Sequence, residues 1–135
     1  MSAVFLISPE GTGQGMTEDS WEGIDIPMMT ITGSRDYSPR TGKPPEWRTE
    51  PYNYSSPGDK YLVFIDGYQA SRRTAAKEGA STYGEIVGEA IASYVYSASI
   101  DFWDAYLKGD AKARERLESE ELQTQTNGTV AMSHK

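Results

Sequence analysis

A short apolar run that ends in a polar turn, PMMTITGSRD at residues 27–36, decides the expected fold of this chain. The run contains β-forming residues and stops abruptly at Gly33, so it predicts a strand that leads into a tight turn. Asp36 closes that turn. Because open α/β sheets gather their functional groups at the carboxyl ends of the strands, Asp36 is the first candidate site residue.

Two further apolar runs, at residues 3–7 and 61–65, are continuous rather than alternating, as expected for parallel strands covered on both faces. A capping box formed by Thr82 and Glu85 then predicts the start of a long helix. An apolar stripe recurs along this helix at spacings of three and four residues and should face the core. Its members are Val87, Ile91, Tyr94, Ala98, Phe102 and Tyr106. The sequence therefore predicts an α/β fold with three parallel strands, a sheet small enough to suggest that the domain is incomplete.

The remaining segments carry weaker patterns. Residues 17–21 predict a short helical turn, whereas residues 37–60 are rich in proline and predict a long loop without regular structure. Asp110 is expected to cap a last short helix that runs through Leu117. Residues 119–135 have no apolar periodicity, so we expect a domain over residues 1–118 followed by a polar, disordered tail.

Composition excludes several classes of function. The formal charge of −7 argues against a nucleic acid or an anionic membrane as partner and indicates a soluble protein. The absence of cysteine excludes disulfides, thiolate metal sites and a cysteine nucleophile. With one histidine and no alternating carboxylate loop, neither a metal nor a cofactor is expected.

The apolar run near the amino terminus is too short for a signal peptide or a membrane span. The chain is therefore expected to be cytoplasmic by default, or exported if an upstream signal is missing.

Four phrases carry a resemblance to a known family: ISPEG at 7–11, IP at 26–27 leading to TGSRD at 32–36, KYLV at 60–63 leading to DG at 66–67, and FWDAYLKGD at 102–110. In this order and spacing they resemble the C-terminal half of α/β-hydrolases, of the bacterial predicted dienelactone hydrolase and chlorophyllase-like kind. The resemblance covers residues 3–118 and implies the last three parallel strands and the closing helices of that fold.

The resemblance also implies a role for Asp36. In the family the corresponding turn carries the triad acid, which holds a histidine in the useful tautomer and stabilises its charged form during acyl transfer. Local sequence alone leaves open that Asp36 simply closes an Asx turn.

The chain departs from the family pattern in two ways. No Gly-x-Ser-x-Gly occurs, and in this fold such a serine elbow should lie on a strand before Ala3. The nearest look-alike contains Ser81, which we assign to a helix start. The position of the family's histidine holds Ala70, and the neighbouring Gln69 cannot act as a base. His134, in the tail, is expected to be a solvated residue.

Two hypotheses follow. In the first, the chain is the C-terminal segment of a serine ester hydrolase, which contributes Asp36 and acts on a small-molecule ester only when an N-terminal half completes it. The chain alone is then inactive. In the second, it is a non-catalytic, hydrolase-like binding module that associates through an exposed sheet edge or through residues 37–60. A Gly-x-Ser-x-Gly encoded upstream of Met1 would favour the first hypothesis.

Overall fold

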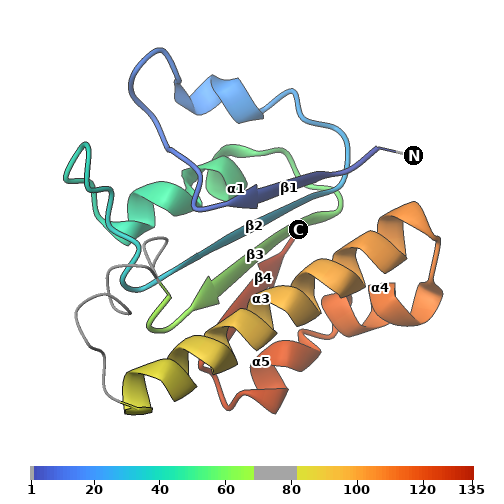
Figure 1. Ribbon diagram of the computed structural model, residues 1–135. Helices are drawn as coiled ribbons and strands as arrows, with labels where there is room; N and C mark the ends of the chain where they lie inside the picture. The colour runs from blue at the N-terminus through green and yellow to red at the C-terminus, as the bar shows by residue number, and fades with distance from the viewer. Residues whose placement is uncertain (1, 69–81) are drawn as a thin grey trace.

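A four-stranded sheet with the spatial order β1-β2-β3-β4 forms the centre of the molecule (Figure 1). The structure is a computed structural model that describes residues 2–68 and 82–135. The strands are β1 (Val4–Ile7), β2 (Met28–Gly33), β3 (Lys60–Ile65) and β4 (Val130–His134). The first three run parallel to one another, and β4 runs antiparallel to β3. The predicted α/β class and the three parallel strands are confirmed at this level.

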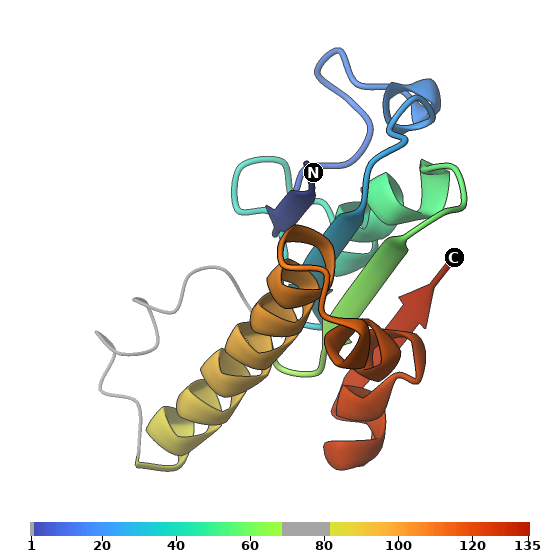
Figure 2. The same ribbon diagram turned by 90° about the vertical axis from the view of Figure 1, so that its right-hand side faces the viewer.

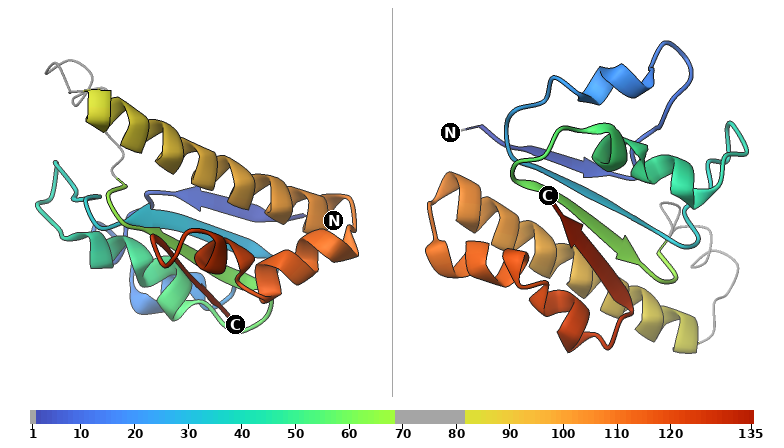
Figure 3. Two further views of the ribbon diagram at one scale, coloured as in Figure 1. Left: turned by 90° about the horizontal axis from the view of Figure 1, so that it is seen from below. Right: turned by 180° about the vertical axis from the view of Figure 1, so that it is seen from behind.

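Helices cover both faces of the sheet (Figures 2 and 3). The long helix α3 (Thr82–Leu107) lies across one face, and α4 (Ala111–Glu118) and α5 (Glu121–Gln125) follow it on the same side. The other face carries the short helix α1 (Glu50–Tyr54) and the single-turn helices η1 (Glu18–Trp21) and η2 (Pro45–Thr49). The sheet is therefore a middle layer between two helical layers.

The core lies between the sheet and α3. Alternate residues of β2 and β3 point toward the helix, and they meet the predicted apolar stripe. Within the described side chains, the fully or nearly buried members of this stripe are Ile91, Ala98, Phe102 and Tyr106. All six residues of β2 are buried, the polar Thr30 and Thr32 included, as expected for a parallel strand covered on both faces. The side chain of Val87 lies outside the described residues.

The predicted disordered tail is wrong. Residues from 119 onward form α5 and then β4, which pairs with β3 in the register Ile65↔Val130 to Tyr61↔His134. Val130 and Met132 point into the core, with 0% and 6% of their surface exposed. Two alternating apolar residues are too short a pattern to predict a strand, so this strand depends on the partner that it finds in β3.

The predicted loop at residues 37–60 is also partly wrong, because η2 and α1 lie within it. Prolines occupy the first turns of both elements, where a missing backbone N–H costs nothing. The indole Nε1 of the buried Trp47 donates to the carbonyl oxygen of Thr12 at 2.8 Å. Proline thus starts these helices instead of excluding them. The other local predictions hold: η1 forms, and Asp110 caps α4 by accepting from Lys112 N and Ala113 N.

Candidate functional site

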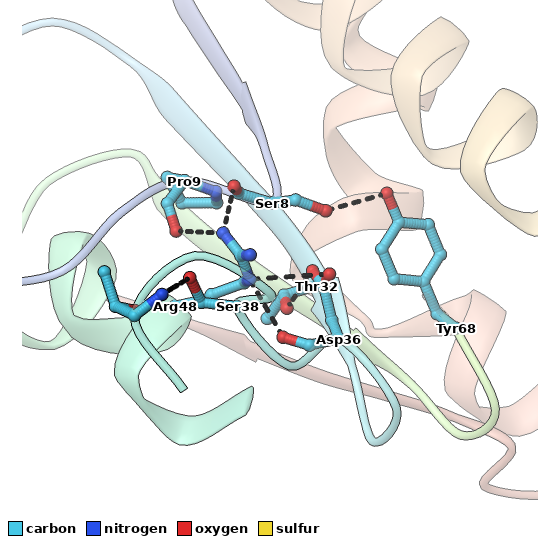
Figure 4. Close-up of polar contacts among 8 residues, drawn as sticks. Ser8, Pro9, Thr32, Asp36, Ser38, Arg48 and Tyr68 are labelled. Carbon is cyan, nitrogen blue, oxygen red and sulfur yellow. Dashed lines mark hydrogen bonds and ion pairs between the residues drawn. The ribbon is translucent and has the colours of Figure 1, made fainter. Parts of the chain in front are cut away.

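Asp36 lies at the carboxyl edge of the sheet, just after the middle parallel strand β2 (Figure 4). Its backbone N–H donates to the carbonyl oxygen of Gly33 at 3.1 Å, which closes the turn. The side chain points inward, so that only 1% of the residue is exposed. Thr32, near the end of β2, donates from its Oγ1 to Asp36 Oδ2 at 2.8 Å. The structure therefore places Asp36 as the sequence predicts, while its catalytic role stays a prediction.

The guanidinium of Arg48 organises the surroundings of Asp36. Arg48 Nε donates to the Asp36 carbonyl oxygen at 2.8 Å and lies 3.4 Å from Asp36 Oδ1. Its Nη1 donates to the carbonyl oxygens of Ser8 and Pro9 at 2.7 and 3.2 Å. The two charged side chains are 8% and 0% exposed. One buried arginine thus ties the turn after β1 to the turn after β2.

Sequence reasoning missed Arg48. It lies in the proline-rich segment assigned to a loop, and its partners are 12 and 40 residues away along the chain. Nothing in the local pattern distinguishes it from the exposed arginines of the chain. An arginine acquires this role only when the strands bring distant backbone carbonyls together.

The turn after β3 packs against the turn that carries Asp36. A Cβ atom at Gly33 would lie 2.0 Å from the Ile65 carbonyl oxygen and 2.4 Å from Tyr68 Cβ, so this position has room for glycine alone. Arg35 N donates to Tyr68 O at 3.1 Å.

A serine side chain adds a second link between the same two turns. Ser34 Oγ donates to Asp66 Oδ1 at 2.7 Å and accepts from Gly67 N at 2.7 Å. Ser34 and Arg35 therefore join the turn that carries Asp36 to the turn after β3.

Two hydroxyl groups complete this edge. Ser8, directly after β1, has its Oγ 3.1 Å from the hydroxyl oxygen of the buried Tyr68, as Figure 4 shows. Ser8 adopts a φ of 50°, a left-handed conformation that is uncommon for a residue other than glycine. Hydroxyl groups can donate and accept hydrogen bonds, but neither is a general base near neutral pH. The ends of all three parallel strands therefore contribute polar groups to one edge.

His134 lies at the opposite end of the sheet from Asp36. It pairs with Tyr61 near the start of β3, whereas Asp36 follows the residue that pairs with Ile65 at the end of β3. These two positions are on the order of 13 Å apart along the strand direction. The His134 ring stacks on Tyr61, and its Nδ1 lies 3.4 Å from Glu120 Oε1.

The expectation for His134 is therefore corrected in part. It is exposed, as predicted, but it belongs to a strand and not to a disordered tail. Even with the tail folded back onto the sheet, the imidazole cannot serve Asp36. The predictions for Gln69, Ala70 and Ser81 lie outside the described residues.

Within residues 2–68 and 82–135, no group of three histidine, cysteine, aspartate or glutamate side chains could hold a metal ion. In the same part of the chain, no helix combines the length and the apolar character needed to cross a bilayer. A groove of about 350 Å³ lies between α3, α4, α5 and β4, far from Asp36 in the fold, and its lining includes Tyr96, Ile100, Arg116, Leu122 and Met132.

Comparison with known proteins gives no match to any protein-family model, curated protein or solved structure. The strand pairing alone defines the fold as a four-stranded, mostly parallel α/β arrangement. The resemblance to α/β-hydrolases stays a hypothesis.

Proposed function

We propose that this chain is the acid-bearing C-terminal part of a serine ester hydrolase of the α/β-hydrolase type. In this role Asp36 orients a histidine that, like the nucleophilic serine, comes from another part of the protein, because the family's histidine position holds Ala70 and His134 lies at the other end of the sheet. The chain alone is inactive, because the sequence contains no Gly-x-Ser-x-Gly.

The buried position of Asp36 carries the proposal. Its carboxyl group is held at the end of the middle parallel strand by Thr32 and Arg48, and it adjoins the turn after the next strand. A triad acid needs such a fixed position, because its role is to hold an imidazole in one tautomer and to stabilise the imidazolium that forms during acyl transfer. The order β1-β2-β3, with every connection between parallel neighbours, also supports the family resemblance.

The resulting mechanism is acyl transfer. A serine hydroxyl attacks the ester carbonyl, the histidine accepts the serine proton and then donates it to the leaving alcohol, and water hydrolyses the acyl-enzyme in a second cycle. In this mechanism Asp36 contributes by orientation and charge and does not transfer the proton itself. The hydrogen-bonded hydroxyl groups of Ser8 and Tyr68 lie on the same edge of the sheet as Asp36.

The first experiment tests the chain itself with a short-chain p-nitrophenyl ester and a fluorophosphonate probe. We expect neither turnover nor labelling. The reading frame upstream of Met1 is then determined and its product is expressed. The proposal requires that this product contain Gly-x-Ser-x-Gly, hydrolyse the ester and react with the probe.

The variant Asp36→Asn in that longer product gives the sharper test. We expect kcat to fall by about 10³ to 10⁴-fold, because an asparagine holds the wrong tautomer of the histidine. Asp66→Asn is the matched control: Asp66 follows the next strand and bonds Ser34, but it does not adjoin the buried carboxyl group, so kcat should change little. An upstream stop codon with translation starting at Met1, or equal effects of both variants, would contradict the proposal.

One observation favours the second candidate, a non-catalytic module. The buried contact between Arg48 and Asp36 gives this carboxylate a structural partner even without a histidine. In that case the longer product, if there is one, hydrolyses no ester, while Asp36→Asn still lowers the free energy of unfolding of the chain.

A further inference from the structure

The two outer edges of the sheet differ in how their backbone groups are satisfied. On β4, the backbone N–H groups of Val130 and Met132 point away from β3. Thr126 Oγ1 accepts from Val130 N at 3.0 Å, and Gln123 Oε1 accepts from Met132 N at 2.8 Å. Side chains from α5 and the turn after it therefore occupy these two outward donors, which hinders further strand pairing; we call this the covered edge.

The edge of β1 has no such cover among the described residues. Val4 N donates to Pro27 O and Ser8 N to Ile31 O, each at 2.8 Å, so these residues point their backbone groups toward β2. Neighbouring residues alternate in a parallel strand, so the N–H and C=O groups of Phe5 and Ile7 point away from β2. In the part of the chain that the structure describes, β1 pairs with β2 alone.

The side chains of β1 also lack the features that discourage pairing. Val4–Ile7 contains no charge and no proline, and Ile7 is 52% exposed. Natural edge strands usually carry a lysine, a proline or a bulge. An uncharged edge with unused donors and acceptors accepts an extended, uncharged segment, and β1 itself has this chemistry.

We propose that β1 pairs antiparallel with β1 of a second copy, so that two four-stranded sheets join into one. Phe5 then lies opposite Ile7 of the second copy on the face covered by α3. The outward N–H and C=O groups of Phe5 in one copy form hydrogen bonds with those of Ile7 in the other, and the two-fold axis passes near Leu6. The segment is neutral, so no like charges meet.

The covered edge of β4 limits this assembly to two chains. Once both β1 strands are paired, each copy presents to solvent the edge that Thr126 and Gln123 cover. A two-fold, self-complementary contact closes, whereas two open edges would allow a growing filament. The inference goes beyond the proposed hydrolase role and concerns residues 1–135 without an N-terminal half. In the longer product of the proposed hydrolase, an upstream strand would compete for the same edge.

Analytical ultracentrifugation of the chain over a concentration series tests the dimer. We expect a species of twice 14.9 kDa that dissociates on dilution. Ile7→Lys should shift the mass to that of one chain, since each copy would place a charged lysine opposite the apolar Phe5 of the other. Ala131→Lys is the matched control: Ala131 is an exposed residue of the covered strand β4, so the dimer should persist. Circular dichroism verifies that both variants fold.

Hydrogen exchange gives a second measurement on the unmodified chain. The amides of Phe5 and Ile7 should be protected at high concentration and exchange faster on dilution, while those of Val130 and Met132 stay protected. Several results would overturn the proposal: one chain at every concentration, equal dissociation of both lysine variants, or a mass that grows beyond two chains. A single chain with protected Phe5 and Ile7 amides would also overturn it, since another segment would then occupy the edge.

Discussion

The two ends of the parallel strands each carry an arginine–carboxylate pair, but in opposite surroundings. At the carboxyl end, the side chains of Arg48 and Asp36 are 8% and 0% exposed. At the amino end, those of Arg114 and Asp59 are 50% and 37% exposed, with Nη2 and Oδ1 3.0 Å apart. The first pair holds backbone turns in place, whereas the second extends a network of tyrosine side chains.

That network is centred on two buried hydroxyl groups. The hydroxyls of Tyr61 and Tyr106 are hydrogen-bonded to each other, and Tyr106 donates to Asp59 Oδ1 at 2.9 Å. Arg114 lies over the ring of Tyr106, 5.6 Å from its centroid. Water can replace most of the hydrogen bonds and charge screening that the exposed Arg114 gives to Asp59, but it cannot reach the buried pair of Arg48 and Asp36. Removing Arg48 should therefore lower the free energy of unfolding several times more than removing Arg114.

Arg48→Met should have the largest effect. It removes the guanidinium that lies beside the buried Asp36 carboxyl group and that donates to the carbonyl oxygens of Ser8 and Pro9. We expect the free energy of unfolding to fall by about 3 to 5 kcal/mol. Urea titration followed by tryptophan fluorescence measures this change. A loss below about 1 kcal/mol would place Arg48 with the exposed pairs and remove the contrast between the two ends.

Gly33→Ala tests the tight contact between the turns at the carboxyl end. The added methyl group collides with the Ile65 carbonyl oxygen and with Tyr68 Cβ, so the turns must separate. We expect a loss of about 1 to 3 kcal/mol in the same titration. Gly23→Ala is the control, because a Cβ there meets nothing within 4 Å. If both alanine variants are equally stable, the turns are not in close contact.

Tyr106→Phe tests the amino end. It removes the hydroxyl that bonds Tyr61 and Asp59, and the expected loss is about 1 kcal/mol near neutral pH. Tyr61→Phe, at the other side of the same hydrogen bond, should show a similar loss, and the double variant should lose less than the sum of the two. Additive losses would indicate that the two hydroxyls do not interact.

The tyrosine network also predicts a pH dependence. Burial, together with the hydrogen bonds to Tyr61 and Asp59, raises the pKa of Tyr106 far above its ordinary value of 10.0. Burial likewise raises the pKa of Tyr61. As pH rises above 10.0, the unfolded chain loses these protons while the folded chain keeps them, so stability should fall. Unfolding measured from pH 8 to about 11 should show a shallower decline for Tyr106→Phe.

Arg114→Gln should have the smallest effect. Its contacts with Asp59 and Glu118 are exposed, so we expect a loss of at most about 1 kcal/mol, which diminishes further in high salt. Measured beside Arg48→Met, it gives the matched comparison between the two ends. Equal losses for the two arginine variants would show that burial does not distinguish the pairs.

Features defined by neighbouring residues could be predicted from the sequence. The continuous apolar runs predicted three strands, and the stripe through Ile91 and Phe102 predicted the face of α3 that is buried. The cap at Asp110 and the position of Asp36 at a strand end were equally local. Each of these patterns lies within one element, so no knowledge of the partner element was needed.

Features that depend on distant partners could not be predicted. Strand β4 has only two inward apolar residues. It forms because it can pair with the edge of β3, whose residues lie 65 to 73 positions earlier in the sequence. The buried role of Arg48, the separation of His134 from Asp36 and the uneven edges of β1 and β4 follow from the same assembly. By itself, the sequence determined the local elements and the candidate acid. The tertiary structure decided that the edge of β1 is open, that Arg48 is buried and that His134 is out of reach of Asp36. The physical reason is that backbone groups from distant segments must form hydrogen bonds with one another when they leave water.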